Sequence, residues 1–240
     1  MVDSQRRELI LIELAALALL VLVILVALTT NIDQQISDRF FDPSGDGWLI
    51  DHTSSRLRLW FYDGPKALVI LFGIGLFGVV LRPSLLRPGW ITRREAMFLL
   101  ACLAAVPAAI GLVRNNSNVQ CPIALQQYGG TQSNASGHVK LSGFLEPLRT
   151  RGCWPSGHAS AGFALLCLAW LKRRRSSQLG FAMLGMTAGL AMGTYQVVRG
   201  SHFASHVLVT GLAAVMLIEL LAYVLDIEEA AVRDVTNRLR

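Results

Sequence analysis

The chain has few charged residues. Asp, Glu, Lys and Arg make up 16% of its 240 residues, whereas about a quarter is usual in a soluble globular domain. Hydrophobic residues account for 53%, and the mean hydropathy is +0.48. These values exclude an ordinary soluble domain. Nearly half of the chain lies in six long apolar runs: 8–29, 66–81, 95–113, 156–171, 179–198 and 206–226.

The six runs have the lengths of membrane-crossing helices. A transmembrane helix needs about 20 apolar residues, with a range of roughly 17–25. Four runs meet this requirement by themselves, and the shorter runs 66–81 and 156–171 meet it with their flanking residues. The sequence therefore predicts an all-α fold, in which residues 1–240 form one integral membrane domain with a bundle of six transmembrane helices.

The first run is predicted to be a retained helix. Arg6 and Arg7 resemble the basic start of a signal peptide, which is the alternative. The apolar stretch 9–28 is longer than the roughly 7–15 residues of a signal peptide, and no small-x-small cleavage site follows it.

The distribution of Lys and Arg predicts the orientation in the membrane. With the N-terminus inside, 13 of the 22 basic residues fall on inner segments, close to helix ends. Basic residues in short loops favour the inner side. We therefore expect both termini inside and outer loops at 30–65, 114–155 and 199–205. The Lys-Arg-Arg-Arg run at 172–175 is a short inner connection, so no nucleic-acid partner is predicted.

The outer loops carry several local predictions. Residues 32–41 could form a short amphipathic helix on the membrane surface, and the aromatic residues 60–62 fit an interfacial belt. Cys121 and Cys153 share the second outer loop, where an oxidising compartment would permit a disulfide. The sequence leaves open whether the two residues meet the required geometry. The other two cysteines lie within apolar runs and are expected to pack as small apolar residues.

Polar residues suited to catalysis gather where the outer loops meet the last four runs. Polar groups are costly in or near the hydrocarbon, so such a cluster indicates a functional site. Three segments far apart in the sequence supply the cluster: Arg114 with Cys121 and Pro122; Pro155, Ser156, Gly157 and His158; and Gln196, Arg199, Gly200, Ser201, His202 and His206.

These groups suit phosphoryl transfer. A helix that opens after Pro155 would direct the backbone N–H groups of Ser156 and Gly157 at phosphate oxygens. Arginine offers a planar fork of donors to the same oxygens. Two histidines can divide the remaining work, one as nucleophile and one as the acid for the leaving group. This chemistry requires no metal or other cofactor.

The motifs resemble those of the PAP2 (type 2 phosphatidic acid phosphatase) superfamily of membrane lipid phosphatases. That family has the motifs Lys-x6-Arg-Pro, Pro-Ser-Gly-His and Ser-Arg-x5-His-x3-Asp. The second is intact at 155–158. The first and third correspond, with substitutions, to Arg114-x6-Cys121-Pro122 and Gln196-x5-His202-x3-His206. The resemblance covers essentially the whole chain and implies the family's six-span fold.

The unchanged positions imply roles by resemblance. His202 matches the family's nucleophile, and His158 matches its general acid. Ser156 and Gly157 match phosphate-binding positions. The resemblance therefore implies a phosphohistidine intermediate formed on His202.

The changed positions make this chain a divergent member of the pattern. Arg114 replaces a lysine and keeps its charge, whereas Cys121 replaces a phosphate-binding arginine. Gln196 stands at the other arginine position, and Arg199, about one helical turn further on, is expected to supply the guanidinium. His206 replaces the aspartate that orients the nucleophile. A neutral imidazole could accept the same hydrogen bond, but it brings no negative charge.

The resemblance implies a metal-independent phosphatase that acts on a lipid phosphomonoester or pyrophosphate. The expected place is the outer face of a bacterial inner membrane, with the lipid phosphate and the membrane lipids as partners. A lipid phosphotransferase and a non-catalytic protein that binds anionic lipid are the alternatives. His202 and His206 could instead chelate a metal from one helix face, although no acidic residue lies nearby. A transporter is disfavoured because the runs contain few charges.

Overall fold

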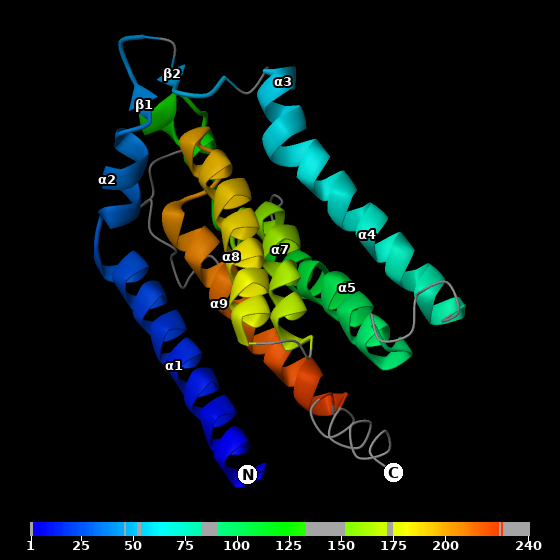
Figure 1. Ribbon diagram of the computed structural model, residues 1–240. Coiled ribbons are helices and arrows are strands. Elements are labelled where there is room, and N and C mark those ends of the chain that lie inside the picture. Colours follow the sequence, from blue (N-terminus) through cyan, green and yellow to red (C-terminus); the bar gives the residue numbers. More distant parts are fainter. Residues whose placement is uncertain are drawn as a thin grey trace, which may run out of the picture.

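Helices account for most of the chain in the computed structural model (Figure 1), in agreement with the predicted fold class. The structure describes residues 2–45, 47–51, 54–82, 91–132, 152–171, 175–225 and 227, with only the backbone at 2–9 and 175–176. The elements are α1 (Val2–Thr29), α2 (Ile32–Asp38), β1 (Phe41–Asp42), β2 (Gly47–Trp48), α3 (Ser55–Arg58), α4 (Gly64–Leu81), α5 (Arg93–Asn115), α7 (Gly157–Ala164), α8 (Arg175–Val198) and α9 (Ala204–Val224).

Among the residues that the structure describes, five helical segments are long and apolar enough to cross a membrane. They are Ile10–Thr29, Ser55–Leu81, Arg93–Asn115, Ser177–Val198 and Ala204–Val224. The remaining apolar run forms the shorter helix Gly157–Trp170, in which α7 continues into 3-10 turns at Leu165–Trp170. The sixth crossing and the inside position of both ends stay predictions. Residues 172–174 of the basic run and residues 228–240 lie outside the described residues.

The second membrane helix begins earlier than the sequence predicts. Helical structure starts at Ser55 and not at 66, because a π-helical turn over Leu59–Asp63 joins α3 to α4. Pro65 has no N–H group, and its ring crowds the carbonyl of a regular preceding turn. A wider turn accommodates this proline without ending the helix. The connection between the first two membrane helices is therefore shorter than the predicted loop 30–65.

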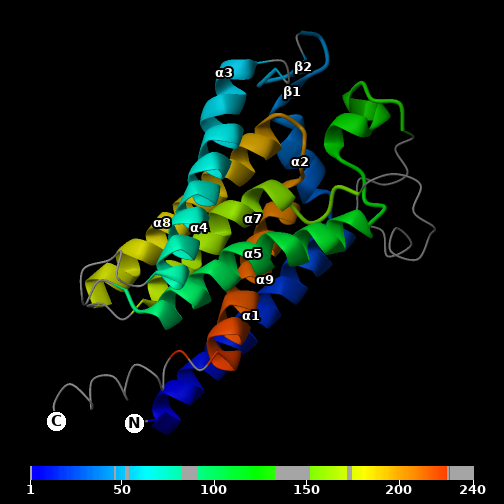
Figure 2. The same ribbon diagram turned by 90° about the vertical axis from the view of Figure 1, so that its right-hand side faces the viewer.

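The short helix α7 lies among the other helices and contacts α5, α8 and α9 (Figures 1 and 2). Glycines permit its close approach to α8. A Cβ atom on Gly162 would lie 2.6 Å from the Gly189 nitrogen, so the two backbones meet where neither residue has a side chain. Small residues serve this purpose widely between membrane helices. Phe163, which is 1% exposed, fills the space beside Gly189 and Gly211.

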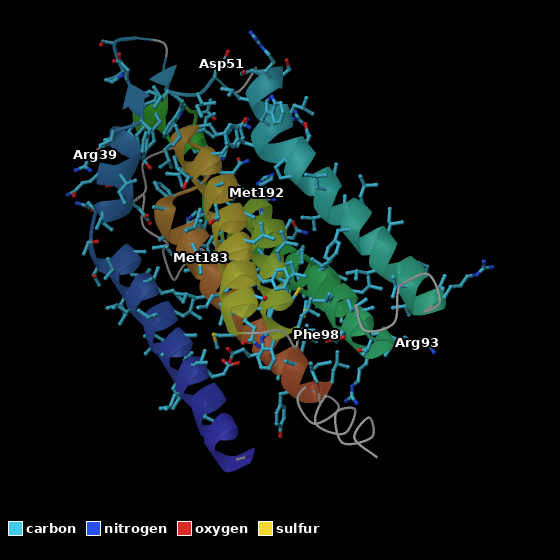
Figure 3. All side chains as sticks on the ribbon, viewed as in Figure 1. Arg39, Asp51, Arg93, Phe98, Met183 and Met192 are labelled. Atoms are coloured by element: carbon cyan, nitrogen blue, oxygen red, sulfur yellow. A yellow bond between two sulfur atoms is a disulfide. The ribbon has the colours of Figure 1, made fainter. Side chains whose placement is uncertain are left out.

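The helix predicted at 32–41 exists as α2, but it docks on the protein. Asp33 and Ser37 are buried, and the Asp33 carboxylate accepts hydrogen bonds from the backbone N–H (2.9 Å) and the hydroxyl of Ser205 in the first turn of α9. The carboxylate thereby satisfies a donor at the positive end of that helix. Arg39 after α2 and Asp51 lie toward the end of the molecule that carries β1 and β2, and Arg93 lies toward the other end (Figure 3).

Candidate active site

The three polar segments meet at one end of the bundle, where α5 and α8 end and α7 and α9 begin. The two histidines predicted to share the catalytic work are in contact there. His158 Nδ1 lies 3.5 Å from His202 Nε2, although 44 residues separate them in the sequence. His202 is 1% exposed. The folded chain thus places two imidazoles from different segments in contact, one of them fully buried and the other half-buried.

Three cations lie close enough to His158 to act on it electrostatically: Arg114, Arg199 and Lys66. Arg114, at the end of α5, is oriented by a hydrogen bond from its Nε to the Gly152 carbonyl (3.1 Å). Its guanidinium lies beside the first residue of α7, since a Cβ atom on Gly157 would be 3.5 Å from Arg114 Nη1. At this distance the Cβ atom and the guanidinium would be in ordinary van der Waals contact without overlap. Arg114 therefore lies beside the start of α7, and its role as a phosphate-binding cation stays a prediction.

The guanidinium of Arg199 is held by aromatic residues. Its Nη1 donates to the Tyr195 hydroxyl (3.2 Å), and its Cζ lies 5.3 Å from the centroid of the same ring. Tyr195 in turn stacks on Phe61 from the π-helical turn, with ring centroids 5.5 Å apart. A cation over a tyrosine face is stabilised by the ring quadrupole. The predicted replacement for the family's arginine is thus a positioned side chain next to the site.

The start of α7 differs in one respect from the prediction. Ser156 is fully buried, and its backbone N–H donates to the Thr210 hydroxyl (2.9 Å) and, at 3.3 Å, to the His206 carbonyl. The expectation that this N–H faces a phosphate is wrong, because α9 supplies the acceptors. The Ser156 hydroxyl has no hydrogen-bond partner among the described residues. Ser156 therefore anchors α7 to α9, and Gly157 remains the predicted phosphate contact at this helix start.

Gln196 and Gly200 build the turn that carries Arg199 and His202. Gly200 has a φ of +71°, its N–H donates to the Val197 carbonyl (2.9 Å), and the Ser201 N–H donates to the Gln196 carbonyl (2.8 Å). This is a Schellman ending of α8, which requires a residue that tolerates positive φ. The Gln196 side chain is 2% exposed, and its Nε2 has no partner among the described residues. Its assignment as a phosphate ligand stays a prediction.

We expect Gly200→Ala to destabilise the protein. Besides the cost of positive φ, a Cβ atom at this position would overlap the Trp48 indole ring. The free energy of unfolding should fall by about 2–4 kcal/mol. Gly180→Ala is the matched control, since a Cβ atom there meets nothing within 4 Å. Thermal unfolding of both variants in detergent would measure the difference, and equal stability of the two variants would contradict the role of this turn.

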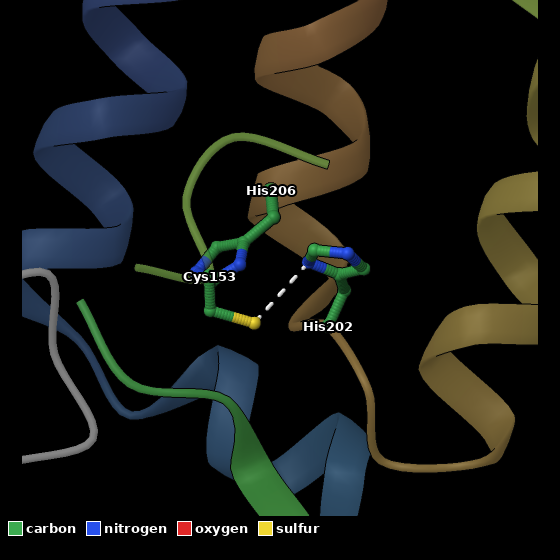
Figure 4. A group of neighbouring side chains, drawn as sticks. All are labelled: Cys153, His202 and His206. Atoms are coloured by element: carbon green, nitrogen blue, oxygen red, sulfur yellow. Dashed lines mark hydrogen bonds between the residues drawn. The ribbon is translucent and has the colours of Figure 1, made fainter. Parts of the chain in front are cut away.

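The side chains of Cys153, His202 and His206 lie close together, next to the contact between His202 and His158 (Figure 4). Cys153 forms a disulfide with Cys121, which answers the question that the sequence leaves open. One nitrogen from each imidazole and the Cys153 sulfur lie within 4.8 Å of one another, as in sites that bind metals. The Cys153 sulfur is bonded to Cys121, however, and a thiolate is the form that ligates metals. With the disulfide closed, the set reduces to two imidazoles.

The hydrogen bond expected between His202 and His206 is not formed. The two rings meet edge to face, with centroids 5.8 Å apart. Both ring nitrogens of His206 are buried without a hydrogen-bond partner among the described residues. His206 occupies the sequence position of the family's aspartate, but the hydrogen bond that its imidazole could accept from His202 is not formed.

Comparison with known proteins supports the reading of the motifs. Residues 95–228, more than half of the chain, match the model of the PAP2 superfamily. The chain belongs to the PAP2 superfamily. Searches of curated proteins and of solved structures gave no match. PAP2 proteins are helical membrane proteins with phosphatase-type activity, in agreement with the apolar helices of this chain.

Within this PAP2 protein, burial keeps the candidate nucleophile neutral. Desolvation lowers the pKa of His202 well below its ordinary value, and the charges of His206, His158 and Arg114 act in the same direction. A hydrogen bond with the Cys153 backbone raises the pKa of His202 and so acts in the opposite direction. A histidine attacks phosphorus only with a lone pair on the attacking nitrogen, so a lowered pKa favours the reactive form at neutral pH.

The helix from Ser55 adds residues to the PAP2 site that the sequence analysis missed. The Tyr62 ring packs on His158 with centroids 4.5 Å apart, and Lys66 one turn later adds a third positive charge. Phe61 also packs on Tyr195, and Trp60 is 74% exposed. The interfacial belt at 60–62 stays a prediction. The sequence signal was Lys66 at the start of an apolar run, where a lone charge is costly.

Proposed function

We propose that this PAP2 protein is a phosphatase that removes a phosphate from a lipid phosphomonoester or pyrophosphate through a phosphohistidine. The observation that carries the proposal is the contact between His158 and His202, with the guanidinium groups of Arg114 and Arg199 beside them. Two imidazoles in contact provide a nucleophile and an acid, and two arginines provide the donors that a phosphoryl group needs.

In the first step, the phosphoryl group enters between the two rings and displaces their contact. His202 Nε2 attacks phosphorus, and the bond from phosphorus to the lipid oxygen breaks. The three cations beside His158 oppose its protonated form, and the negative charge of the incoming phosphate favours that form. With the phosphate bound, His158 donates a proton to the lipid oxygen, so the lipid leaves as a neutral alcohol, or as a monophosphate when the substrate is a pyrophosphate. Arg114, Arg199 and the Gly157 N–H stabilise the negative charge on the equatorial oxygens.

In the second step, the neutral His158 accepts a proton from water while the water oxygen attacks phosphorus. The bond from phosphorus to Nε2 breaks, inorganic phosphate leaves, and His202 regains its lone pair. His158 thus ends the cycle protonated, as it began. An alcohol of a second lipid in place of water would give the phosphotransferase reaction instead.

The site is proposed to face the outside of a bacterial inner membrane. The crowding of basic residues at the opposite helix ends supports this side. A disulfide next to the site supports it too, because disulfides persist in oxidising compartments. At this position the headgroup of a membrane lipid can reach the histidines while its chains stay in the bilayer.

A phosphate-release assay tests the proposal. Purified protein in detergent is supplied with phosphatidic acid, phosphatidylglycerol phosphate, a polyprenyl pyrophosphate or lipid A, each with EDTA present. We expect release of inorganic phosphate from at least one lipid, undiminished by EDTA. Transfer of the phosphate to an added lipid alcohol would instead identify a phosphotransferase. Binding of these lipids without turnover would identify a non-catalytic relative and refute the phosphatase.

The orientation can be tested with introduced cysteines. Gln126 and Ser177 are exposed. Gln126 belongs to the 3-10 turn Gln126–Tyr128, which lies at the end of the bundle that carries β1 and β2, and Ser177 belongs to the first turn of α8, at the opposite end (Figure 1). The native cysteines should not interfere, because Cys102 and Cys167 are buried and the other two form the disulfide. In intact cells we expect an impermeant maleimide to label Gln126→Cys but not Ser177→Cys. The reverse labelling would place the site on the inner side.

A further inference from the structure

We propose that the Cys121–Cys153 disulfide is a positioning element of the active site: its Cys153 sulfur holds His202 with the proton on Nδ1 and the lone pair on Nε2. This inference rests on the proposed function, since it concerns the nucleophile of that reaction. It assigns to a disulfide the orienting role that the PAP2 pattern gives to an aspartate.

The geometry of the sulfur contact carries the inference. Cys153 Sγ lies 3.4 Å from His202 Nδ1, and both residues are buried. A disulfide sulfur has no hydrogen, so it can only accept, and the imidazole Nδ1–H must be the donor. A neutral imidazole has one N–H group, and its other nitrogen then carries a lone pair. The other nitrogen is Nε2, which faces His158 and the phosphoryl site.

No other side chain among the described residues competes for Nδ1. The ring nitrogens of His206 have no hydrogen-bond partner among these residues, and His158 contacts the Nε2 side of the His202 ring. The Cys153 backbone also forms a hydrogen bond with His202, so both the sulfur and the backbone of Cys153 contact this residue. The sulfur also lies 2.9 Å from the carbonyl oxygen of Ser201, the residue before His202.

Neighbouring bonds fix the sulfur where it can act on His202. The Cys153 N–H donates to the Val119 carbonyl (2.7 Å), and the Ser117 hydroxyl donates to the Trp154 carbonyl (2.7 Å). Cys121 ties the same two segments covalently. The nucleophile is thereby positioned by a loop crosslink outside α9, whereas the PAP2 aspartate would act from α9 itself, at the position of His206.

Reduction of the disulfide should reverse the tautomer. A trialkylphosphine breaks the S–S bond and becomes the phosphine oxide with oxygen from water, while the two water protons complete the two thiols. The Cys153 thiol can then donate its S–H to Nδ1. The imidazole proton would move to Nε2, which then has no lone pair for attack on phosphorus. The active site should therefore lose activity under reducing conditions.

A rescue experiment tests the inference. In Cys121→Ala/Cys153→Ala the Cys153 backbone remains, and only the sulfur is removed. We expect kcat to fall about 100-fold, the scale of a misplaced catalytic group, with KM changed less than about twofold. Adding His206→Asp restores the aspartate of the PAP2 pattern. The kcat of this triple variant should exceed that of the double variant at least about tenfold. Unchanged kcat in the double variant, or a loss that His206→Asp does not recover, would overturn the inference.

A second measurement uses the wild-type protein, so it requires neither a folded double variant nor turnover. Nitrogen-15 NMR of histidine-labelled wild-type protein reports which imidazole nitrogen carries the proton, and the spectrum of His202→Ala assigns the signal. We expect a protonated Nδ1 in the oxidised protein and a protonated Nε2 after phosphine treatment. The Cys102→Ala/Cys167→Ala variant, which lacks the two free cysteines, should respond to reduction like the wild type. A tautomer that is unchanged by reduction would refute the inference, even if the phosphatase assay succeeds.

Discussion

His202→Ala is expected to abolish turnover and covalent labelling together. The side chain supplies the lone pair that attacks phosphorus, and loss of a nucleophile costs about 10⁴-fold or more. The assay is release of phosphate from a labelled lipid, combined with denaturation of the protein during turnover. A phosphohistidine survives alkali and is lost in acid, so the wild type should carry an acid-labile label and the variant none.

His158→Ala should behave differently in the same experiment. Loss of a general acid costs about 10²–10⁴-fold, and the cost should be greatest for a poor leaving group. An aryl phosphate with an acidic alcohol needs little proton donation, so its hydrolysis should decline least. Because the two residues act in one step, the double variant should be little worse than His202→Ala alone. Turnover near the wild-type rate in His202→Ala would refute the mechanism.

Arg199→Lys is expected to lower kcat by about 100-fold, the effect of losing one oriented donor to transition-state charge. A lysine keeps the charge, but it cannot reproduce the planar, two-point contact of a guanidinium with phosphate oxygens. It would also lose the geometry that Tyr195 imposes on Arg199. Single-turnover kinetics in detergent would measure the effect on the chemical step.

Arg39→Lys is the matched control, since Arg39 is exposed and lies after α2, toward the same end of the molecule. It should leave kcat unchanged. If Arg199→Lys and Arg39→Lys gave the same kcat, Arg199 would have no place in the site, and Arg114 with Lys66 would be left as the cations that act on His158. Tyr195→Phe, which removes the hydroxyl bonded to Arg199, should give an intermediate loss.

The linear order of the residues was enough to predict much of this site. The spacings around Arg114, His158 and His202 identified the PAP2 pattern, and the structure brings these residues together. Such motifs are readable because each segment is short and begins or ends a helix. The apolar runs were equally readable, since a membrane helix must bury a long apolar surface whatever it packs against.

Other features depended on contacts between distant segments. Tyr62 and Lys66 belong to the site because the helix from Ser55 packs against α7 and α8, and no local pattern indicates which face of it turns inward. In a membrane helix, lipid-facing and protein-facing residues are both apolar, so periodicity carries little information. The N–H of Ser156 was misassigned for a related reason: its acceptor, Thr210, lies 54 residues away.

The sequence by itself determined the class of protein, the apolar helices and the identity of the two candidate catalytic histidines. Only the tertiary structure decided that Cys153, and not His206, contacts Nδ1 of His202. His206 stands at the aspartate position of the third motif, whereas Cys153 belongs to none of the three motifs. Which of them reaches the ring depends on a disulfide and a turn 48 residues apart, and those distances exist only in the folded chain.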